Sequence, residues 1–261
     1  MTKIIMNGFN GRMGQTICKI ANDNGCEIVA GIDIFFDSAL LAASGTKFPA
    51  FHSFKELEDC DSPIEADVII DFSTPSAFND ITTYAVKNSL PVVMCTTGLS
   101  EMQLAEIEVL SKKVPVFQSA NMSLGVNLLI DLVKKAAKFL EGSFDIEIVE
   151  KHHNQKLDAP SGTALMIADE INSALETPCD YVYDRQPVRQ KRSKTEIGIH
   201  AVRGGTIVGD HSVIFAGYNE VIEINHSAMS REVFATGALK AATYIADKKS
   251  GKYSMSDMLK D

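Results

Sequence analysis

A glycine-rich turn near the start of the chain most constrains its fold, because it joins a strand-like run to a helical pattern. Residues 3–7 form a short β-type run, glycines recur with the spacing G-x-x-G-x-x-G over residues 8–14, and a helical pattern occupies 15–21. A second β-type run, 27–32, ends in Asp33, nineteen residues past the last of these glycines. Glycines let a pyrophosphate approach the backbone, the helix start stabilises its charge, and the acid accepts hydrogen bonds from a ribose. We predict a dinucleotide site here; a purely structural turn is the alternative, since the spacing departs from the commoner G-x-G-x-x-G.

Strand-like and helical patterns keep alternating along the first half of the chain. Further strand-like runs lie at 66–72, 91–94 and 114–118, and helical patterns open at 73–75 and span 100–112. The alternation predicts an α/β fold with an N-terminal Rossmann-type, doubly wound parallel sheet, which binds ligands at the carboxyl ends of its strands. The residues expected at such ends are Asp33, Ser73, Thr96, Thr97 and Ala120–Met122. Residues 35–63 lack clear periodicity, and we interpret them as a loop with a short helix around 54–57.

The pattern changes after a long predicted helix at 123–140. A strand-like run at 144–149 precedes a helix at 161–174, and three more strand-like runs follow without a helical pattern between them, at 195–202, 206–216 and 221–226. They predict a second, α+β domain that contains a mixed or antiparallel sheet. A helix at 230–246 then returns to the first domain. We therefore place a dinucleotide-binding domain at 1–122 and 230–261, and a second domain at 123–229.

Composition and charge exclude several classes of protein. Of the 261 residues 45% are hydrophobic and 23% charged, and the formal net charge of −9 argues against binding to nucleic acid or to an anionic membrane. No apolar run reaches the length of a membrane span. The five cysteines are scattered without CxxC spacing, which predicts unpaired thiols in a reducing compartment. Because the N-terminus enters a strand without a secretory signal, we expect a cytoplasmic protein.

Residues 150–164 concentrate groups that can hold and protonate an anion. His152, His153 and Lys156 supply protons and positive charge, and Ser161–Thr163 read as the first turn of a helix. A helix start leaves backbone N–H groups unpaired and carries partial positive charge, so it can seat a carboxylate or phosphate. Gly162 allows close approach to the backbone, and neighbouring hydroxyls can add hydrogen bonds. We predict an anion site; an ordinary capped helix after a surface loop is the alternative.

Other chemistries fit the residues less well. Lysine is a poor metal ligand and no acid or cysteine completes a zinc pattern near the two histidines, so we expect no metal site. Ser161 lacks the G-x-S-x-G context of a nucleophile, and Cys95 has no histidine near it in sequence, which favours a packed thiol. The histidines expected on strands, namely His200, His211 and His226, are interpreted as hydrogen-bonded structural residues. Arg203 is interpreted as part of a turn, although it could reach a ligand or a neighbouring subunit.

Several ordered motifs together carry a resemblance to a known family. They are Glu150-x-His152-His153-x-x-Lys156-x-Asp158-Ala159-Pro160-Ser161-Gly162-Thr163-Ala164, Gly8 to Gly14, Asp71-Phe72-Ser73-x-Pro75, Thr96-Thr97-Gly98 and Ala120-Asn121-Met122-Ser123-x-Gly125-Val126-Asn127. On these motifs the chain resembles the 4-hydroxy-tetrahydrodipicolinate reductase (dihydrodipicolinate reductase) family over essentially its whole length. That family reduces a cyclic dicarboxylate by hydride transfer from NADH or NADPH with loss of water, which gives tetrahydrodipicolinate in the diaminopimelate pathway of lysine biosynthesis.

The resemblance also implies roles for individual residues. His152 would be the general acid, and Lys156 a proton donor and charge partner of the substrate. The substrate carboxylates would be held by His153, Ser161, Gly162 and Thr163. The nicotinamide cofactor would be lined by Gly8, Phe9, Asn10, Gly11, Arg12, Met13, Asp33, Cys95, Thr96, Thr97, Ser119, Ala120, Asn121 and Met122. The second domain would bind substrate and, through its sheet, build a homotetramer.

Two departures from the family pattern bear on the cofactor. Cys95 stands where the family commonly has glycine, which places a side chain near the expected nicotinamide ribose. No arginine follows Asp33 to receive a 2′-phosphate, and a carboxylate repels that phosphate, so we predict a preference for NADH over NADPH. Arg12 could still pair with a phosphate. Two alternative functions remain: another two-domain NAD(P)-dependent oxidoreductase acting on a small carboxylic acid, and a non-catalytic nucleotide sensor, which would not need His152 and Lys156 beside a helix start.

Overall fold

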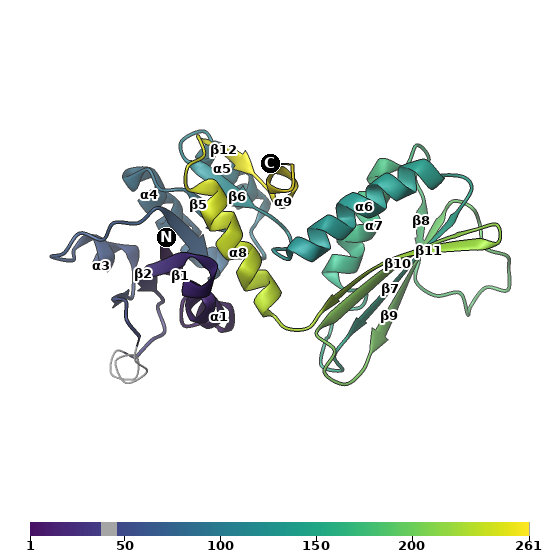
Figure 1. Cartoon of the computed structure of the whole chain (residues 1–261), viewed down its shortest axis with the longest axis horizontal. Helices are drawn as coiled ribbons and strands as arrows, with labels where there is room; N and C mark the ends of the chain where they lie inside the picture. The colour runs from purple at the N-terminus through teal and green to yellow at the C-terminus, as the bar shows by residue number, and fades with distance from the viewer. Residues whose placement is uncertain (38–45, 261) are drawn as a thin grey trace. The chain divides into compact units, whose positions relative to one another are not determined.

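The chain divides into two compact units. A computed structural model describes residues 1–37 and 46–260. One unit comprises Met1–Ser123 and Glu232–Asp261, and the other comprises Leu124–Arg231 (Figure 1). Of the loop expected at 35–63, residues 38–45 lie outside the described part. No helix of the described residues is both long enough and apolar enough to cross a membrane.

A seven-stranded, fully parallel sheet forms the centre of the first unit. Its order is β12-β6-β5-β4-β1-β2-β3. The strands are β1 Thr2–Asn7, β2 Cys26–Ile32, β3 Ala50–Phe51, β4 Val68–Asp71, β5 Val92–Met94, β6 Pro115–Gln118 and β12 Gly251–Tyr253. The central strands are buried along most of their length, and this burial explains their continuous apolar sequences. The predicted Rossmann-type sheet is therefore confirmed.

Helices cover both faces of this sheet. They are α1 Arg12–Ile20, α3 Phe54–Glu58, α4 Phe78–Asn88, α5 Glu101–Leu110, α8 Glu232–Ile245 and α9 Met255–Met258, with 3₁₀ turns at Asn22–Asn24 and Pro75–Ala77. α3, α4 and α5 share one apolar core with the strands, while α8 contacts α1 and lies against β4, β5 and β6 (Figure 1). The short helix expected around 54–57 is confirmed as α3. The strands β3 and β12 and the helix α9 had not been predicted.

The second unit is a five-stranded mixed sheet with two helices, which confirms the predicted α+β domain with a mixed or antiparallel sheet, although the strand β8 had not been predicted. Its order is β11-β10-β7-β9-β8, in which β7, β8 and β9 run parallel and β10 and β11 pair antiparallel. The elements are α6 Leu124–Leu140, β7 Asp145–His152, α7 Gly162–Ala174, β8 Asp180–Val182, β9 Glu196–Arg203, β10 Gly209–Gly217 and β11 Glu220–Ala228. Every second residue of β7 is buried, and Ile146 and Ile148 pack in one core with apolar side chains of α6 and α7. The same alternation continues to Glu150 and His152 and turns both toward this face.

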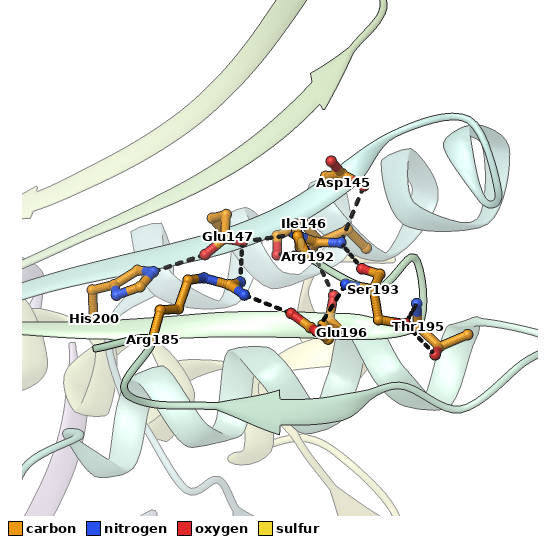
Figure 2. A network of polar contacts seen from close by, with 9 residues as sticks. All are labelled: Asp145, Ile146, Glu147, Arg185, Arg192, Ser193, Thr195, Glu196 and His200. Carbon is orange, nitrogen blue, oxygen red and sulfur yellow. Dashed lines mark hydrogen bonds and ion pairs between the residues drawn. The ribbon is translucent and has the colours of Figure 1, made fainter. Parts of the chain in front are cut away.

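An ion-pair network occupies the opposite face of β7. Glu147 accepts hydrogen bonds from Arg185 Nη2 at 2.7 Å, Arg192 Nε at 2.9 Å and His200 Nε2 at 2.7 Å, and Arg185 also reaches Glu196 (Figure 2). Burial disfavours ionisation of Glu147, but the hydrogen bonds from His200 and Arg192 outweigh it and lower the pKa of the carboxyl. The network ties the segment between β8 and β9 to the sheet. His200 is thus the hydrogen-bonded structural histidine that its place on a strand predicted.

Candidate active site

The expected cofactor residues gather at one edge of the parallel sheet. Because all seven strands run in the same direction, the residues that follow β1, β2, β5 and β6 lie at the same edge. These residues include all those predicted from the sequence, namely Gly8–Met13, Asp33, Cys95–Thr97 and Ser119–Met122. β1 lies between β2 and β4, so the order of the chain reverses there. That reversal is where doubly wound sheets bind nucleotides.

The glycine turn after β1 can be built only with glycine at two positions. Gly8 has a φ of +79°, and a Cβ there would lie 2.6 Å from the carbonyl oxygen of Phe72. A Cβ on Gly14 would lie 2.1 Å from the carbonyl oxygen of Gly8. Gly11 is the N-cap of α1, and no side chain of the described residues caps the helix there. The first N–H groups of a helix lack intrahelical partners. The turn therefore fits a cradle for an anionic diphosphate.

Asp33 is held beside this turn by backbone donors. Its Oδ2 accepts a hydrogen bond from Asn10 N at 3.1 Å, and its Oδ1 accepts one from Phe35 N at 2.9 Å. The Phe9 side chain is buried and packs edge-on against Phe36, so only the backbone of Phe9 is available to a ligand. A carboxylate fixed at the end of β2 has acceptor capacity left for two ribose hydroxyls.

Asp71, which we had not singled out as a site residue, connects three strand ends at this edge. It is 1% exposed, its Oδ1 accepts from Asn7 Nδ2 at 2.8 Å and Ser73 Oγ at 2.6 Å, and its Oδ2 accepts from Thr96 Oγ1 at 2.6 Å. Burial raises the pKa of Asp71 despite these donors. Burial, with the nearby Asp71 charge, also raises the pKa of the Cys95 thiol well above its usual range, which agrees with a packed thiol. The loops after β1, β4 and β5 are thus fixed to one another.

A buried carboxylate organises the predicted anion site of the second unit. Glu150 is 0% exposed, and its Oε2 lies 2.6 Å from His152 Nδ1. Arg203 donates to both oxygens at 2.7 Å, and Ser161 N donates to Oε1 at 3.0 Å. Burial disfavours ionisation, but the hydrogen bonds from Arg203 and His152 prevail and lower the pKa of Glu150. Glu150 is therefore an ionised, fully paired carboxylate beneath His152.

His211 closes this cluster from strand β10, where it pairs in register with Glu150. Its Nε2 lies 3.2 Å from Ser161 Oγ, and its ring stands edge-on to that of His152 at 5.3 Å between centroids. The Ser161 hydroxyl also caps α7, because it accepts from Ala164 N at 3.1 Å. Burial lowers the pKa of His211 to about 4, and the charge of His152 acts in the same direction. His211 is consequently neutral at pH 7, and Ser161 is a buried cap whose hydroxyl is already engaged.

The remaining predicted substrate residues lie around the start of α7. Gly162 and Thr163 form its first turn, and a Cβ on Gly162 would meet no atom within 4 Å. Lys156 and His153 belong to the preceding loop, and Lys156 Nζ pairs with Asp158 Oδ1 at 2.8 Å. No group of three or more His, Cys, Asp and Glu side chains among the described residues is arranged to bind a metal ion. A helix N-terminus, a histidine and a lysine thus offer anion binding and proton donation together.

The neutral state of His211 predicts a pH dependence of stability. The folded-state pKa of about 4 is below the ordinary 6.5, so the unfolded chain binds this proton more readily. The contribution that this neutral histidine makes to the free energy of unfolding is therefore fully present above pH 6.5 and is lost as the pH falls toward 4. From pH 7 to pH 5 we expect the free energy of unfolding to fall by about 2 kcal/mol more in the wild type than in His211→Gln. Urea unfolding of both proteins at the two pH values measures this, and equal pH dependence would contradict it.

Comparisons with known proteins agree along the whole chain. Residues 2–122 match a family model described as dihydrodipicolinate reductase, N-terminus, and residues 125–259 match one described as dihydrodipicolinate reductase, C-terminus. The 4-hydroxy-tetrahydrodipicolinate reductase of Caldanaerobacter subterraneus subsp. tengcongensis is 54% identical over 261 residues, which cover 100% of this chain and 99% of that protein. The enzyme of the same name from Clostridium novyi is 50% identical, with the same coverage.

Solved structures show the same relationship. A dipicolinate-bound dihydrodipicolinate reductase from Paenisporosarcina sp. TG-14 is 26% identical, with a TM-score of 0.80 and 97% of each chain covered. A scyllo-inositol dehydrogenase from Lactobacillus casei, solved with NAD(H) and scyllo-inositol, is 14% identical, with a TM-score of 0.60 and 99% and 93% of the two chains covered. This second likeness concerns the fold alone.

Proposed function

The chain belongs to the dihydrodipicolinate reductase family, and we propose that it reduces 4-hydroxy-tetrahydrodipicolinate to tetrahydrodipicolinate with a nicotinamide cofactor and loss of water. This step belongs to the diaminopimelate route to lysine. The observation that carries the proposal is the cluster of Glu150, His152 and Ser161 at the N-terminus of α7, which combines a proton donor with an anion site. A cyclic dicarboxylate has the charge that such a site binds.

In this proposal the second unit holds and protonates the substrate. The N–H groups of Gly162 and Thr163 at the start of α7 bind one carboxylate, with His153 beside them. His152 gives a proton to the carbon or nitrogen that becomes electron-rich when the conjugated imine is reduced. Lys156 supplies positive charge against the substrate and helps to protonate it. The residues thus act by positioning, charge and proton transfer.

The first unit holds the cofactor, which supplies the hydride when bound. The N–H groups at the start of α1 bind its diphosphate, and Gly8 and Gly14 leave the room that this requires. Asp33 accepts hydrogen bonds from the adenosine ribose, and Thr96, Asn121 and their neighbours line the nicotinamide end. We extend the proposal to a cytoplasmic homotetramer assembled through the sheet of the second domain; five free cysteines agree with a reducing compartment.

NADH is the cofactor that this arrangement favours. The Asp33 carboxylate, already fixed by two backbone donors, lies where a 2′-phosphate would bring more negative charge. We expect wild type to use NADH with the higher kcat/KM, and Asp33→Asn to raise the NADPH/NADH ratio of kcat/KM about tenfold, which corresponds to ~1.4 kcal/mol. Asp23→Asn, an equal charge change at an exposed turn, serves as the control. Equal use of both cofactors by wild type would contradict the preference, and loss of NADPH activity in Arg12→Met would identify Arg12 as a phosphate partner.

The reaction itself is tested by following the oxidation of NADH and NADPH. Purified protein is mixed with pyruvate, aspartate semialdehyde and the synthase that condenses them, so that the unstable substrate forms in place. We expect rapid oxidation that requires both proteins. If neither cofactor is consumed although NADH binds, the first unit is still a cofactor site but the proposed substrate is wrong. An NAD(P)-dependent oxidoreductase of another small acid would then replace it; a non-catalytic sensor is disfavoured by the Glu150–His152 pair.

A further inference from the structure

We propose that Glu150 is the positioning residue of the proton donor: it holds the His152 imidazole with a hydrogen on Nδ1 and leaves Nε2 to carry the transferred proton. This inference rests on the proposed function, because it presumes that His152 is the donor. It adds a residue that touches neither substrate nor cofactor but determines which atom of the acid reacts. Arg203, which donates to both oxygens of Glu150, holds this carboxylate in position.

The hydrogen bonds of Glu150 determine the tautomer of His152. An ionised carboxylate can only accept, so the nitrogen 2.6 Å from Glu150 Oε2 must donate, and that nitrogen is Nδ1 of His152. The other imidazole nitrogen, Nε2, is therefore the one that gains and loses a proton. Arg203 and Ser161 N occupy the remaining acceptor positions of Glu150. With four donors around it, the carboxylate has no freedom to rotate away from the imidazole.

The surroundings of Nε2 agree with this assignment. Gly209, the first residue of β10, lies beside it, and a Cβ on Gly209 would be 3.1 Å from Nε2. Glycine keeps that side of the imidazole clear. The neighbouring ring, His211, contacts Ser161 through its own Nε2, and its Nδ1 has no hydrogen-bond partner among the described residues, so His211 does not hydrogen-bond His152. Among the described residues, Glu150 thus holds Nδ1 of His152 tightly, while Nε2 has no side-chain hydrogen-bond partner.

Arg203 connects this pair to the substrate loop. It pairs in register with His152 across β7 and β9, and it donates to both oxygens of Glu150. Its Nη2 also donates to the carbonyl oxygen of Asp158 at 2.7 Å, two residues after Lys156. One guanidinium therefore fixes the carboxylate and the loop that carries Lys156. The planar fork of arginine suits this double task, and lysine could not reproduce it.

The opposite face of β7 provides a matched control. Glu147 also bonds a histidine Nε2 and arginine side chains (Figure 2). The alternation along β7 turns it to the face opposite His152. We compare Glu150→Gln with Glu147→Gln. In Glu150→Gln, kcat is expected to fall about 10²-fold while KM changes less than threefold, because the imidazole remains in place but can adopt the wrong tautomer. In Glu147→Gln, kcat stays within threefold of wild type.

Nitrogen-15 NMR of the unliganded protein measures the tautomer of His152, which would not change in Glu150→Gln if Glu150 had only a structural role. The His152 signals are identified by their absence in His152→Gln, and neutral imidazole shows which nitrogen carries hydrogen. We expect Nδ1–H in wild type and Glu147→Gln, and a mixture or Nε2–H in Glu150→Gln. Wild-type His152 with Nε2–H overturns the proposal even if Glu150→Gln fails to fold, and so does a Glu150→Gln enzyme with kcat within threefold of wild type. If wild type does not reduce the substrate, the proposed function fails, but the tautomer result still decides the role of Glu150.

Discussion

His152→Gln is expected to lower kcat by about 10²- to 10⁴-fold while leaving KM for the substrate within a few-fold of wild type. Glutamine retains a polar side chain of similar reach but cannot donate a proton as an acid does. His152 pairs with Glu150 at 2.6 Å, but the start of α7 is held by the bond from Ser161 N to Glu150 and the loop of Lys156 by the bond from Arg203 to the Asp158 carbonyl. Removing the imidazole therefore leaves both in place. Binding therefore persists while the chemical step slows. Steady-state kinetics with NADH and with substrate formed in place separate the two parameters.

His200→Gln is the natural comparison for this experiment. His200 also bonds a glutamate of β7, Glu147 (Figure 2), which the alternation along β7 turns away from the candidate site. We expect His200→Gln to turn over at nearly the wild-type rate. If both variants lose activity equally, the loss reflects the fold and not the removal of an acid. Unchanged turnover in His152→Gln would remove His152 from the mechanism.

The first unit was largely predictable, because its signals are local. The glycines at 8 and 14 stand where the backbone admits no Cβ, and the apolar run of β4 is buried over its whole length. The short strands β3, β8 and β12 were not predictable. Each has only two or three residues, and each is defined by hydrogen bonds to a neighbour distant in sequence. Such strands follow from the assembled sheet and not from a pattern of their own.

The sequence predicted those residues of the candidate site that are close together in one motif. It did not predict those that meet only because distant strands pair in the sheet. The cluster of His152, Ser161 and Gly162 could be found in one motif. Glu150 could have been found too, since it continues the buried alternation of Ile146 and Ile148, where a charge requires a partner. That partner, Arg203, is 53 residues away and meets Glu150 only because β9 pairs with β7. Interpreting Arg203 as part of a turn was wrong, because it is the last residue of β9, and that interpretation missed its contact with Glu150.

Lys156→Met is expected to reduce kcat/KM by about 10³-fold, with losses in both kcat and affinity, in contrast to His152→Gln. The side chain of Lys156 is only 20% exposed, and its Nζ pairs with Asp158, which is 60% exposed. Removing a partly buried cation that faces an anionic substrate costs on the order of 4 kcal/mol, and this energy corresponds to that factor. Methionine keeps the apolar stem and removes the charge. The same steady-state assay measures the change.

Asp158→Asn separates two ways in which Lys156 could act. If the lysine contacts the substrate, the Asp158 pair merely holds it before binding, and Asp158→Asn should retain most of kcat because the ammonium remains. If the lysine serves only to fix the loop through this pair, breaking the pair from either side should be equally harmful. The Arg203 bond to the Asp158 carbonyl survives in both variants, because it involves the backbone. The loop therefore stays anchored in both variants. A large loss of kcat/KM in Lys156→Met alone would show that the lysine acts on the substrate. Equal losses in the two variants would contradict this role.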